Sequence, residues 1–430
     1  MRTVVSFESF GDITVFKLED APSDVEGLGV NAVADVTPPE GADPVARGQA
    51  MMQRLAGHPP VKAGLDLALS RPPDAEPLPL YFHMLASAAD ELPWEQLYAA
   101  PHGFCALDRR WPVARIARRR RRITDRAFDG RLHLVAVLSA ASRSGVPQLQ
   151  SLLSAAGSED AAAVGLKLHV ISGEEAVLQE AANSGLPNVT SETMAGDSVG
   201  LCKQIAAARP TLVHLLCHGG AVAGVRTLAF ANLADFDAGE ETGSVRVKAA
   251  DLVTAVTASD PWLVLLNACG TADATDGPAL AHDLAYFGVP AVIGMRRLVD
   301  LGDANKFSAA LYAEVLGVVR KALDPDGPPG VRTLDWAAAL TVPRMALSGP
   351  DPAAIDSWSD PVLYVQEDDL RVFRASAQMS ASDYTALRGQ LDVWQAYQQT
   401  LDPARTPPEA LAEVAAKIAE LEAAIARAAT

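Results

Sequence analysis

Short apolar runs recur through the middle of the chain, and stretches with helical spacing separate them. The runs lie at residues 132–138, 166–171, 211–217, 262–268, 290–295 and 361–365. Apolar strands that alternate with helices are typical of a mainly parallel sheet that is covered on both faces. The pattern therefore predicts an α/β core over residues 126–372, with helices near 147–156, 198–208, 279–287 and 303–322.

The first 125 residues have a less regular pattern, in which short apolar stretches are broken by Pro, Gly and Asp. Alternating residues on either side of a Gly-Asp turn predict strands at 3–7 and 13–18. A helix is expected at 45–55, and residues 104–107 look extended. Residues 1–125 are therefore predicted to form an α+β lobe.

Residues 373–430 differ again, because their apolar residues recur three or four positions apart in two stripes. This spacing predicts an antiparallel helical hairpin. The hairpin either packs on its own domain or serves as an oligomerisation or docking element. The two stripes consist of Leu387, Leu391, Trp394 and Leu401, and of Leu411, Val414, Ile418, Leu421 and Ile425.

Composition excludes several classes of protein. With 49% hydrophobic and 21% charged residues, the chain has enough apolar material for a large core and is not disordered. None of the apolar runs approaches the ~18 residues of a membrane span, and no secretory signal is visible. Four cysteines in 430 residues make no disulfide framework, so we expect free thiols and a cytoplasmic location. Cys105 and Cys202 are expected to be ordinary buried cysteines.

The formal charge of −17 argues against nonspecific nucleic-acid binding by the chain as a whole. One basic run, at residues 118–122, is the exception. We expect it to be a solvated linker surface, although contact with nucleic acid or an acidic partner, or self-cleavage, is the alternative.

Two of the apolar runs end in reactive side chains. Residues 211–217 lead into His218, Gly219 and Gly220, and residues 262–268 lead into Cys269 and a glycine. Neighbouring parallel strands bring their carboxyl ends about 5 Å apart, at the edge of the sheet where ligands bind. If these two strands are neighbours, His218 can therefore face Cys269 across a crevice.

This pair predicts catalysis by a thiolate, because an imidazole can take the thiol proton and later protonate a leaving amine. The N–H groups of Gly219 and Cys269 are candidates for an oxyanion hole. Alone, each residue would more often be structural, but their joint position favours function. His214, Cys217 and His218 do not predict a metal site, because Cys217 points opposite to the histidines, which are about 13 Å apart along a strand.

Five segments carry a family resemblance: ELPWEQLY (91–98), VHLLCHGG (213–220), LVLLNACGTA (263–272), the segment at 276–300 and PVLYV (361–365). Together they resemble CHAT-domain proteases, bacterial relatives of caspases and separases. The resemblance implies a caspase-like fold, with His218 as general base and Cys269 as nucleophile; His214 matches a second histidine that is common in that strand. Cys269 follows His218 by 51 positions, close to the caspase spacing of about 50.

The resemblance also implies an acidic pocket for the residue before the scissile bond. Asp300 best matches the acidic position, and Asp303 is the second candidate. A carboxylate there would favour Arg or Lys by charge-assisted hydrogen bonds. The alternatives are that Asp303 caps a helix and that Asp300 is a solvated turn residue. Arg296 and Arg297 depart from the family pattern and could admit acidic side chains nearby.

We therefore predict a cysteine endopeptidase that acts through an acyl-enzyme and uses no metal and no cofactor. Its expected partners are a protein substrate and a separate activating or regulatory protein. The helical repeats that many CHAT proteins carry are not visible here, so regulation is expected from that separate protein, from the N-terminal lobe or from the C-terminal hairpin. Neither a membrane nor a nucleic acid is expected as a partner. Family analogy suggests a role in bacterial defence or regulated cell death. The alternative is a catalytically silent scaffold that uses the same fold for protein binding.

Overall fold

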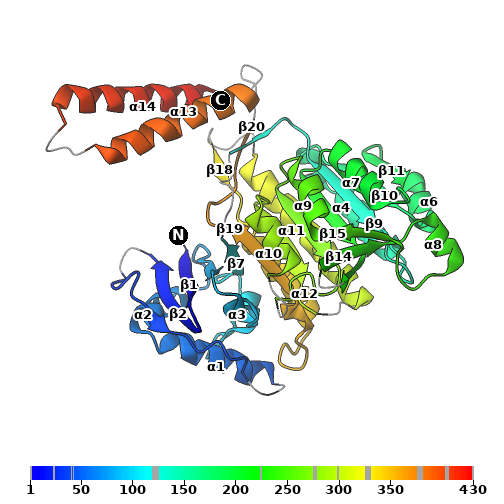
Figure 1. The fold of residues 1–430 in the computed structure, drawn as a ribbon, viewed down its shortest axis with the longest axis horizontal. Coiled ribbons are helices and arrows are strands. Elements are labelled where there is room, and N and C mark those ends of the chain that lie inside the picture. Colours follow the sequence, from blue (N-terminus) through cyan, green and yellow to red (C-terminus); the bar gives the residue numbers. More distant parts are fainter. Residues whose placement is uncertain are drawn as a thin grey trace.

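One continuous sheet organises the protein (Figure 1). The computed structural model describes residues 2–22, 25–39, 41, 43–118, 125–222, 225–274, 278–297, 300–324, 331–374, 381–401 and 406–428. Within these residues the sheet has twelve strands. Their order is β11 (Val189–Thr193), β10 (Lys167–Ser172), β9 (His133–Leu138), β12 (Leu212–Leu216), β16 (Leu263–Asn267), β17 (Ala291–Met295), β19 (Pro361–Gln366), β7 (Val113–Ala117), β4 (Leu80–Met84), β1 (Thr3–Phe10), β2 (Ile13–Asp20) and β3 (Ala32–Val33).

The six strands from β11 to β17 are parallel, and the apolar runs predicted five of them; they missed β11, which has no buried apolar residue. β19 runs antiparallel to β17 and parallel to β7, so it joins the core to the strands of the N-terminal lobe. Beyond β7, the strands β4 and β1 are again parallel, and the hairpin of β1 and β2 turns at Gly11. The α+β lobe and the α/β core therefore share one sheet.

Helices cover both faces of the parallel sheet. Successive residues of each strand point to opposite faces, and the residues on both faces are mostly apolar. In β9, Leu134 and Leu138 pack into the larger core cluster, whereas Val135 and Val137 pack into the cluster on the opposite face. The face of the larger cluster is covered by α4 (Val146–Ala156), α6 (Glu175–Asn183), α11 (Leu301–Ala322) and α12 (Ala338–Ser348). The opposite face is covered by α7 (Ser198–Ala207), α9 (Ala249–Thr257) and α10 (Leu280–Tyr286).

Smaller elements complete the lobe and the edges of the core. The lobe adds α1 (Pro44–Ala56), α2 (Pro59–Leu69), α3 (Ser87–Asp90), the 3₁₀ turns Trp94–Gln96 and Cys105–Leu107, and a pair of short strands, β5 (Tyr98–Ala99) and β6 (Gly103–Phe104). The core adds α5 (Glu159–Ala163), α8 (Leu233–Ala238), the 3₁₀ turn Ser357–Ser359, a sheet of β13 (His218–Val222), β14 (Val225–Phe230) and β15 (Val245–Lys248), and a sheet of β18 (Arg332–Thr333), β20 (Arg371–Arg374) and β8 (Arg126–Phe128).

The predicted helical hairpin is present as α13 (Ala381–Thr400) and α14 (Pro408–Ala428). Figure 1 shows it projecting from the body beside β18 and β20. Its apolar stripes form a separate small core with Phe373, in which Leu391, Val414, Ile418 and Leu421 are buried. Among the described residues, no helix is both long and apolar enough to cross a membrane. The arginines at 119–122 lie outside the described residues.

Buried charges join the lobe to the core. The guanidinium of Arg115 on β7 donates to both oxygens of Glu95, at 3.1 and 2.8 Å, and to Asp90 at 2.7 Å. Arg296, which follows β17, donates to the same Glu95 carboxylate at 2.7 Å. Burial raises the pKa of Glu95, but the positive charges of Arg115 and Arg296 outweigh burial and lower the pKa from 4.5 to about 2. Glu95 therefore stays ionised inside the protein.

This network predicts a loss of stability in the variant Glu95→Gln. The substitution leaves the buried Arg115 and the partly buried Arg296 without their shared carboxylate, a change that costs about 3–5 kcal/mol. Because the folded pKa of Glu95 is below 4.5, its contribution is complete above that pH and is lost as the pH falls towards 2. Urea unfolding across this pH range should show a steeper acid loss in the wild type than in the variant. Glu91→Gln, at an exposed position nearby, is the control and should unfold like the wild type.

Candidate active site

The parallel pairing of β12 and β16 sets the position of the two predicted catalytic residues. Leu216 is paired with Asn267 at the end of the shared ladder. His218 and Cys269 each follow two residues later, so they leave the sheet at the same level on neighbouring strands. The structure thus places the two strand ends side by side.

Gly219 brings the backbones of these two strand ends into direct contact. A Cβ atom at Gly219 would lie 2.0 Å from the carbonyl oxygen of Cys269 and 3.5 Å from its nitrogen. Only a residue without a side chain fits at this distance. At Gly220, in contrast, a Cβ atom would meet nothing within 4 Å. The first glycine after His218 is therefore required for close approach, and the second is not.

The His218 imidazole is oriented by a backbone group. Its Nε2 lies 2.7 Å from the carbonyl oxygen of Ala141, in the loop after β9. A carbonyl oxygen only accepts hydrogen bonds, so Nε2 carries the proton and Nδ1 of the neutral ring is the basic nitrogen. Sequence reasoning missed Ala141, because a contact through a backbone carbonyl leaves no signal in the residue type.

The turn after Cys269 is fixed to the next strand of the sheet. Gly270 has φ +65°, a conformation that favours glycine. The Thr271 hydroxyl donates to Ala268 O at 2.9 Å and accepts from Met295 N, also at 2.9 Å. Met295 ends β17, so these bonds hold the turn of Cys269 against the end of that strand.

Cys269 is half-buried and free; Cys202 is also half-buried, contrary to expectation, whereas Cys105 and Cys217 are buried. Burial raises the pKa of Cys105 to about 12 and raises that of Cys202. Burial is the main cause, and the nearby Cys269 a smaller one, of a pKa of Cys217 that lies well above its ordinary value. Cys217 packs into the core cluster on the face of the sheet that α7, α9 and α10 cover. These three thiols are therefore unreactive by comparison with an accessible thiol.

His214 has a structural position. It is completely buried on β12, and its Nδ1 lies 2.9 Å from the hydroxyl of Tyr312 on α11. Burial lowers its pKa from 6.5 to about 3, so the ring is neutral. Within the described residues, no group of three or more His, Cys, Asp or Glu side chains is arranged to hold a metal ion.

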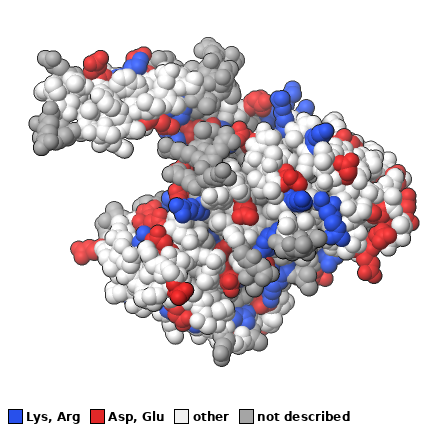
Figure 2. Space-filling view, viewed as in Figure 1, with Lys and Arg blue, Asp and Glu red and all other residues white. Residues whose placement is uncertain are grey.

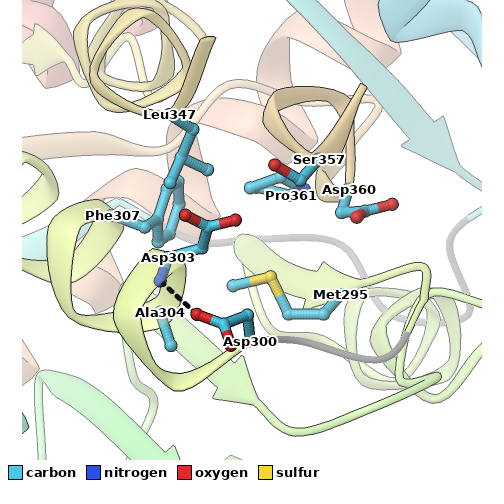
Figure 3. Close-up of a pocket in the computed structure, with 9 residues that line it drawn as sticks. All are labelled: Met295, Asp300, Asp303, Ala304, Phe307, Leu347, Ser357, Asp360 and Pro361. Atoms are coloured by element: carbon cyan, nitrogen blue, oxygen red, sulfur yellow. Dashed lines mark hydrogen bonds between the residues drawn. The ribbon is translucent and has the colours of Figure 1, made fainter. Parts of the chain in front are cut away.

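A pocket of about 90 Å³ opens beside the end of β17, one strand away from Cys269 (Figure 3). Asp300 and Asp303 both line it, together with Asp360. Asp300 also caps α11, because its Oδ1 accepts from Gly302 N at 2.8 Å and from Asp303 N at 3.3 Å. The helix cap is thus Asp300 rather than Asp303. The apolar part of the wall consists of Met295, Ala304, Phe307, Leu347 and Pro361.

Arg297 already neutralises one of the three carboxylates. Its guanidinium donates to both oxygens of Asp360, at 2.7 and 3.0 Å, and to Asp356 at 2.9 Å. Asp303 is paired more weakly, with the exposed amine of Lys306 at 3.6 Å, and Asp300 makes no ion pair with the described residues. Residues 298 and 299 of this loop lie outside the described residues.

Comparison with known families identifies the chain. The family model of the CHAT domain matches residues 45–362, about three quarters of the sequence. The chain belongs to the CHAT-domain family. The CHAT region begins within α1 and ends within β19, so it contains both strand ends, the Glu95 network and the acidic pocket. The β1–β2 hairpin and the helices α13 and α14 lie outside it.

Other comparisons are distant or negative. Among solved structures, the Arg-specific cysteine proteinase gingipain R is similar with a TM-score of 0.38 and 12% sequence identity. The similarity covers 68% of this chain and 63% of that chain, so this CHAT protein spans less than two thirds of the gingipain length. A search among curated proteins gives no match.

The contact at Gly219 predicts different effects for two adjacent substitutions. Gly219→Ala should displace His218 from Cys269, because the new Cβ atom would overlap a backbone oxygen, at a cost of about 1–3 kcal/mol. We expect alkylation of Cys269 by iodoacetamide to slow about tenfold, which corresponds to about 1.4 kcal/mol. Gly220→Ala is the matched control and should react like the wild type. Equal rates for the two variants would contradict the backbone contact. Circular dichroism checks that both remain folded.

Proposed function

We propose that this protein is a cysteine endopeptidase in which Cys269 is the nucleophile and His218 the general base. The observation that carries the proposal is the placement of both residues at one level on neighbouring strands, with Nε2 of His218 tied to Ala141. This hydrogen bond leaves Nδ1 free to accept a proton. A scaffold that only binds proteins has no need for a histidine held in one tautomer beside an accessible thiol.

The proposed reaction has two stages. His218 Nδ1 takes the thiol proton, and the thiolate of Cys269 attacks the carbonyl carbon of the scissile bond. The C–N bond then breaks, His218 returns the proton to the leaving amine, and a thioester remains on Cys269. In the second stage His218 deprotonates a water molecule, which hydrolyses the thioester and restores the thiol.

The oxyanion of each tetrahedral intermediate needs donors beside Cys269. The backbone N–H groups of Gly219 and Cys269 are the proposed pair, and the tight approach of the two backbones supports this assignment. Because backbone donors are fixed by the fold, they need no reorganisation when the charge develops.

The proposed substrate has Arg or Lys before the scissile bond. The pocket that holds Asp300 and Asp303 lies beside the strand next to β16, within reach of a long side chain on a residue attached to Cys269. Its apolar wall can contact the aliphatic stem of such a side chain, while the two carboxylates accept hydrogen bonds from the cationic head.

The first test of the proposal compares cysteine variants on a peptide library. Cys269→Ala should abolish cleavage, and His218→Ala should slow it by at least about 10²–10⁴-fold, the usual contribution of a general base. Cys202→Ala removes another half-buried thiol and should leave activity unchanged. Cleavage that persists in Cys269→Ala would contradict the assignment of Cys269 as the nucleophile. If the wild type cleaves nothing and a thiol probe labels Cys269 no faster than Cys105, the scaffold alternative holds instead.

The second test compares substrates that carry Arg or its neutral analogue citrulline before the scissile bond. Asp300→Asn keeps an amide that can still cap α11, so it removes the charge alone. We expect Asp300→Asn and Asp303→Asn each to lower kcat/KM for the Arg substrate about 10-fold or more, the size of a charged hydrogen bond, and to leave the citrulline substrate unaffected. Asp160→Asn, where Asp160 pairs with Arg320 near the far end of α11, is the control. Equal losses on both substrates would show a structural effect instead.

A further inference from the structure

A second cavity lies on the other side of the proposed catalytic pair. It has a volume of about 220 Å³ and is formed where the loops after β9 and β10 meet α8. Ser142 and Arg143 come from the first loop, Glu174 from the second, and Phe236 and Glu240 from α8 and the turn after it. Neither the predicted dyad nor the acidic pocket uses these residues.

Hydrogen bonds fix the walls of this cavity. The Glu174 carboxylate accepts from the Ser144 hydroxyl at 2.6 Å and from Gly145 N at 2.7 Å, which joins the loops after β9 and β10. The Ser142 hydroxyl donates to the carbonyl oxygen of Glu241 at 3.4 Å, across to the turn after α8. The cavity is therefore formed before any ligand binds.

The geometry of the dyad decides which part of a substrate would pass over this cavity. The His218 imidazole lies towards β9, because it bonds to Ala141, and the acidic pocket lies on the opposite side of Cys269, beside β17. The leaving amine must receive its proton from His218, so it lies on the imidazole side. The residues that follow the scissile bond therefore extend from Cys269 over the ends of β12, β9 and β10.

Strand spacing indicates which residue would reach the cavity. Strands are about 4.8 Å apart, so the ends of β9 and β10 lie about 10–14 Å from the end of β16. An extended chain advances about 3.3 Å per residue. The third and fourth residues after the scissile bond lie at about this distance, and a long side chain extends the reach of the second or third residue to the cavity.

The lining indicates a cationic ligand with an apolar stem. Phe236 is half-buried and offers a ring for the stem, and the Glu240 carboxylate makes no ion pair or hydrogen bond with the described residues. Arg143 already has a partner of its own. Figure 2 shows Asp and Glu side chains gathered over the end of the molecule where α6 and α8 lie, which adds to the attraction for a cation.

We propose that this cavity binds an Arg or Lys side chain on the second or third residue after the scissile bond. The proposal rests on the endopeptidase function proposed above and adds a specificity site on the leaving-group side. With the acidic pocket on the other side of Cys269, it describes a substrate that has basic residues on both sides of the cleaved bond.

The test varies one position at a time, over four residues after the scissile bond, in fluorogenic peptides that carry Arg, Lys, citrulline or Glu there. We expect the wild type to prefer Arg or Lys over citrulline about 3- to 5-fold in kcat/KM at the second or third position, the size of a partly exposed charge contact. Glu240→Gln should abolish this preference. Glu241→Gln, at the exposed neighbour that does not line the cavity, should keep it.

The outcomes separate the two proposals. If no peptide is cleaved and the Cys269 thiol is unreactive, the endopeptidase function fails. If peptides are cleaved through Cys269 but all four positions show no preference, or the preference survives in Glu240→Gln, only the leaving-side site is wrong. A preference for Glu would assign recognition to Arg143 and would also overturn the proposal of a basic side chain.

Discussion

The in-register pairing of β12 with β16 is the constraint on which the proposed chemistry depends. Because Leu216 is paired with Asn267, His218 and Cys269 emerge together. A shift of one residue would turn one of the two side chains to the opposite face of the sheet. The contact of Gly219 with the Cys269 backbone reinforces this register, since the strand ends are too close for any side chain. The surrounding loops then only orient the side chains of His218 and Cys269.

The second constraint is the buried charge network around Glu95, which makes the N-terminal lobe part of the site. Arg115 and Arg296 reach this carboxylate from β7 and from the end of β17. A buried ion pair is weak evidence for net stability, because desolvation offsets attraction, but losing one partner is costly. The network therefore acts mainly to fix geometry. It holds Arg296 in place, one residue after Met295, which the turn of Cys269 contacts.

Apolar periodicity was sufficient to predict the parallel core and the helical hairpin, because both depend on side chains that face a core. It placed His218 and Cys269 at strand ends, but that these strands are neighbours comes from the pairing of β12 with β16. Periodicity failed to predict features that depend on backbone conformation or backbone hydrogen bonds. Residues 104–107 were expected to be extended, yet Cys105–Leu107 forms a 3₁₀ turn closed by the bond from Asp108 N to Cys105 O. Three consecutive apolar residues have no period. The glycine-rich strand β13 and the carbonyl of Ala141 were missed for the same reason, since neither depends on a particular side-chain pattern.

The charge of the acidic pocket follows from contacts that lie partly in the lobe. Asp356 accepts from Arg297 at 2.9 Å and from Arg47 on α1 at 2.9 Å. This pairing directs Arg297 towards Asp360, where it forms a bidentate pair. Burial raises the pKa of Asp360, and Arg297 offsets this effect only in part. A carboxylate paired in this way adds little to the attraction for a ligand cation. Under the proposed specificity for Arg or Lys, the attraction would come mainly from Asp300, because helix capping uses only its Oδ1, whereas Asp303 also pairs with Lys306.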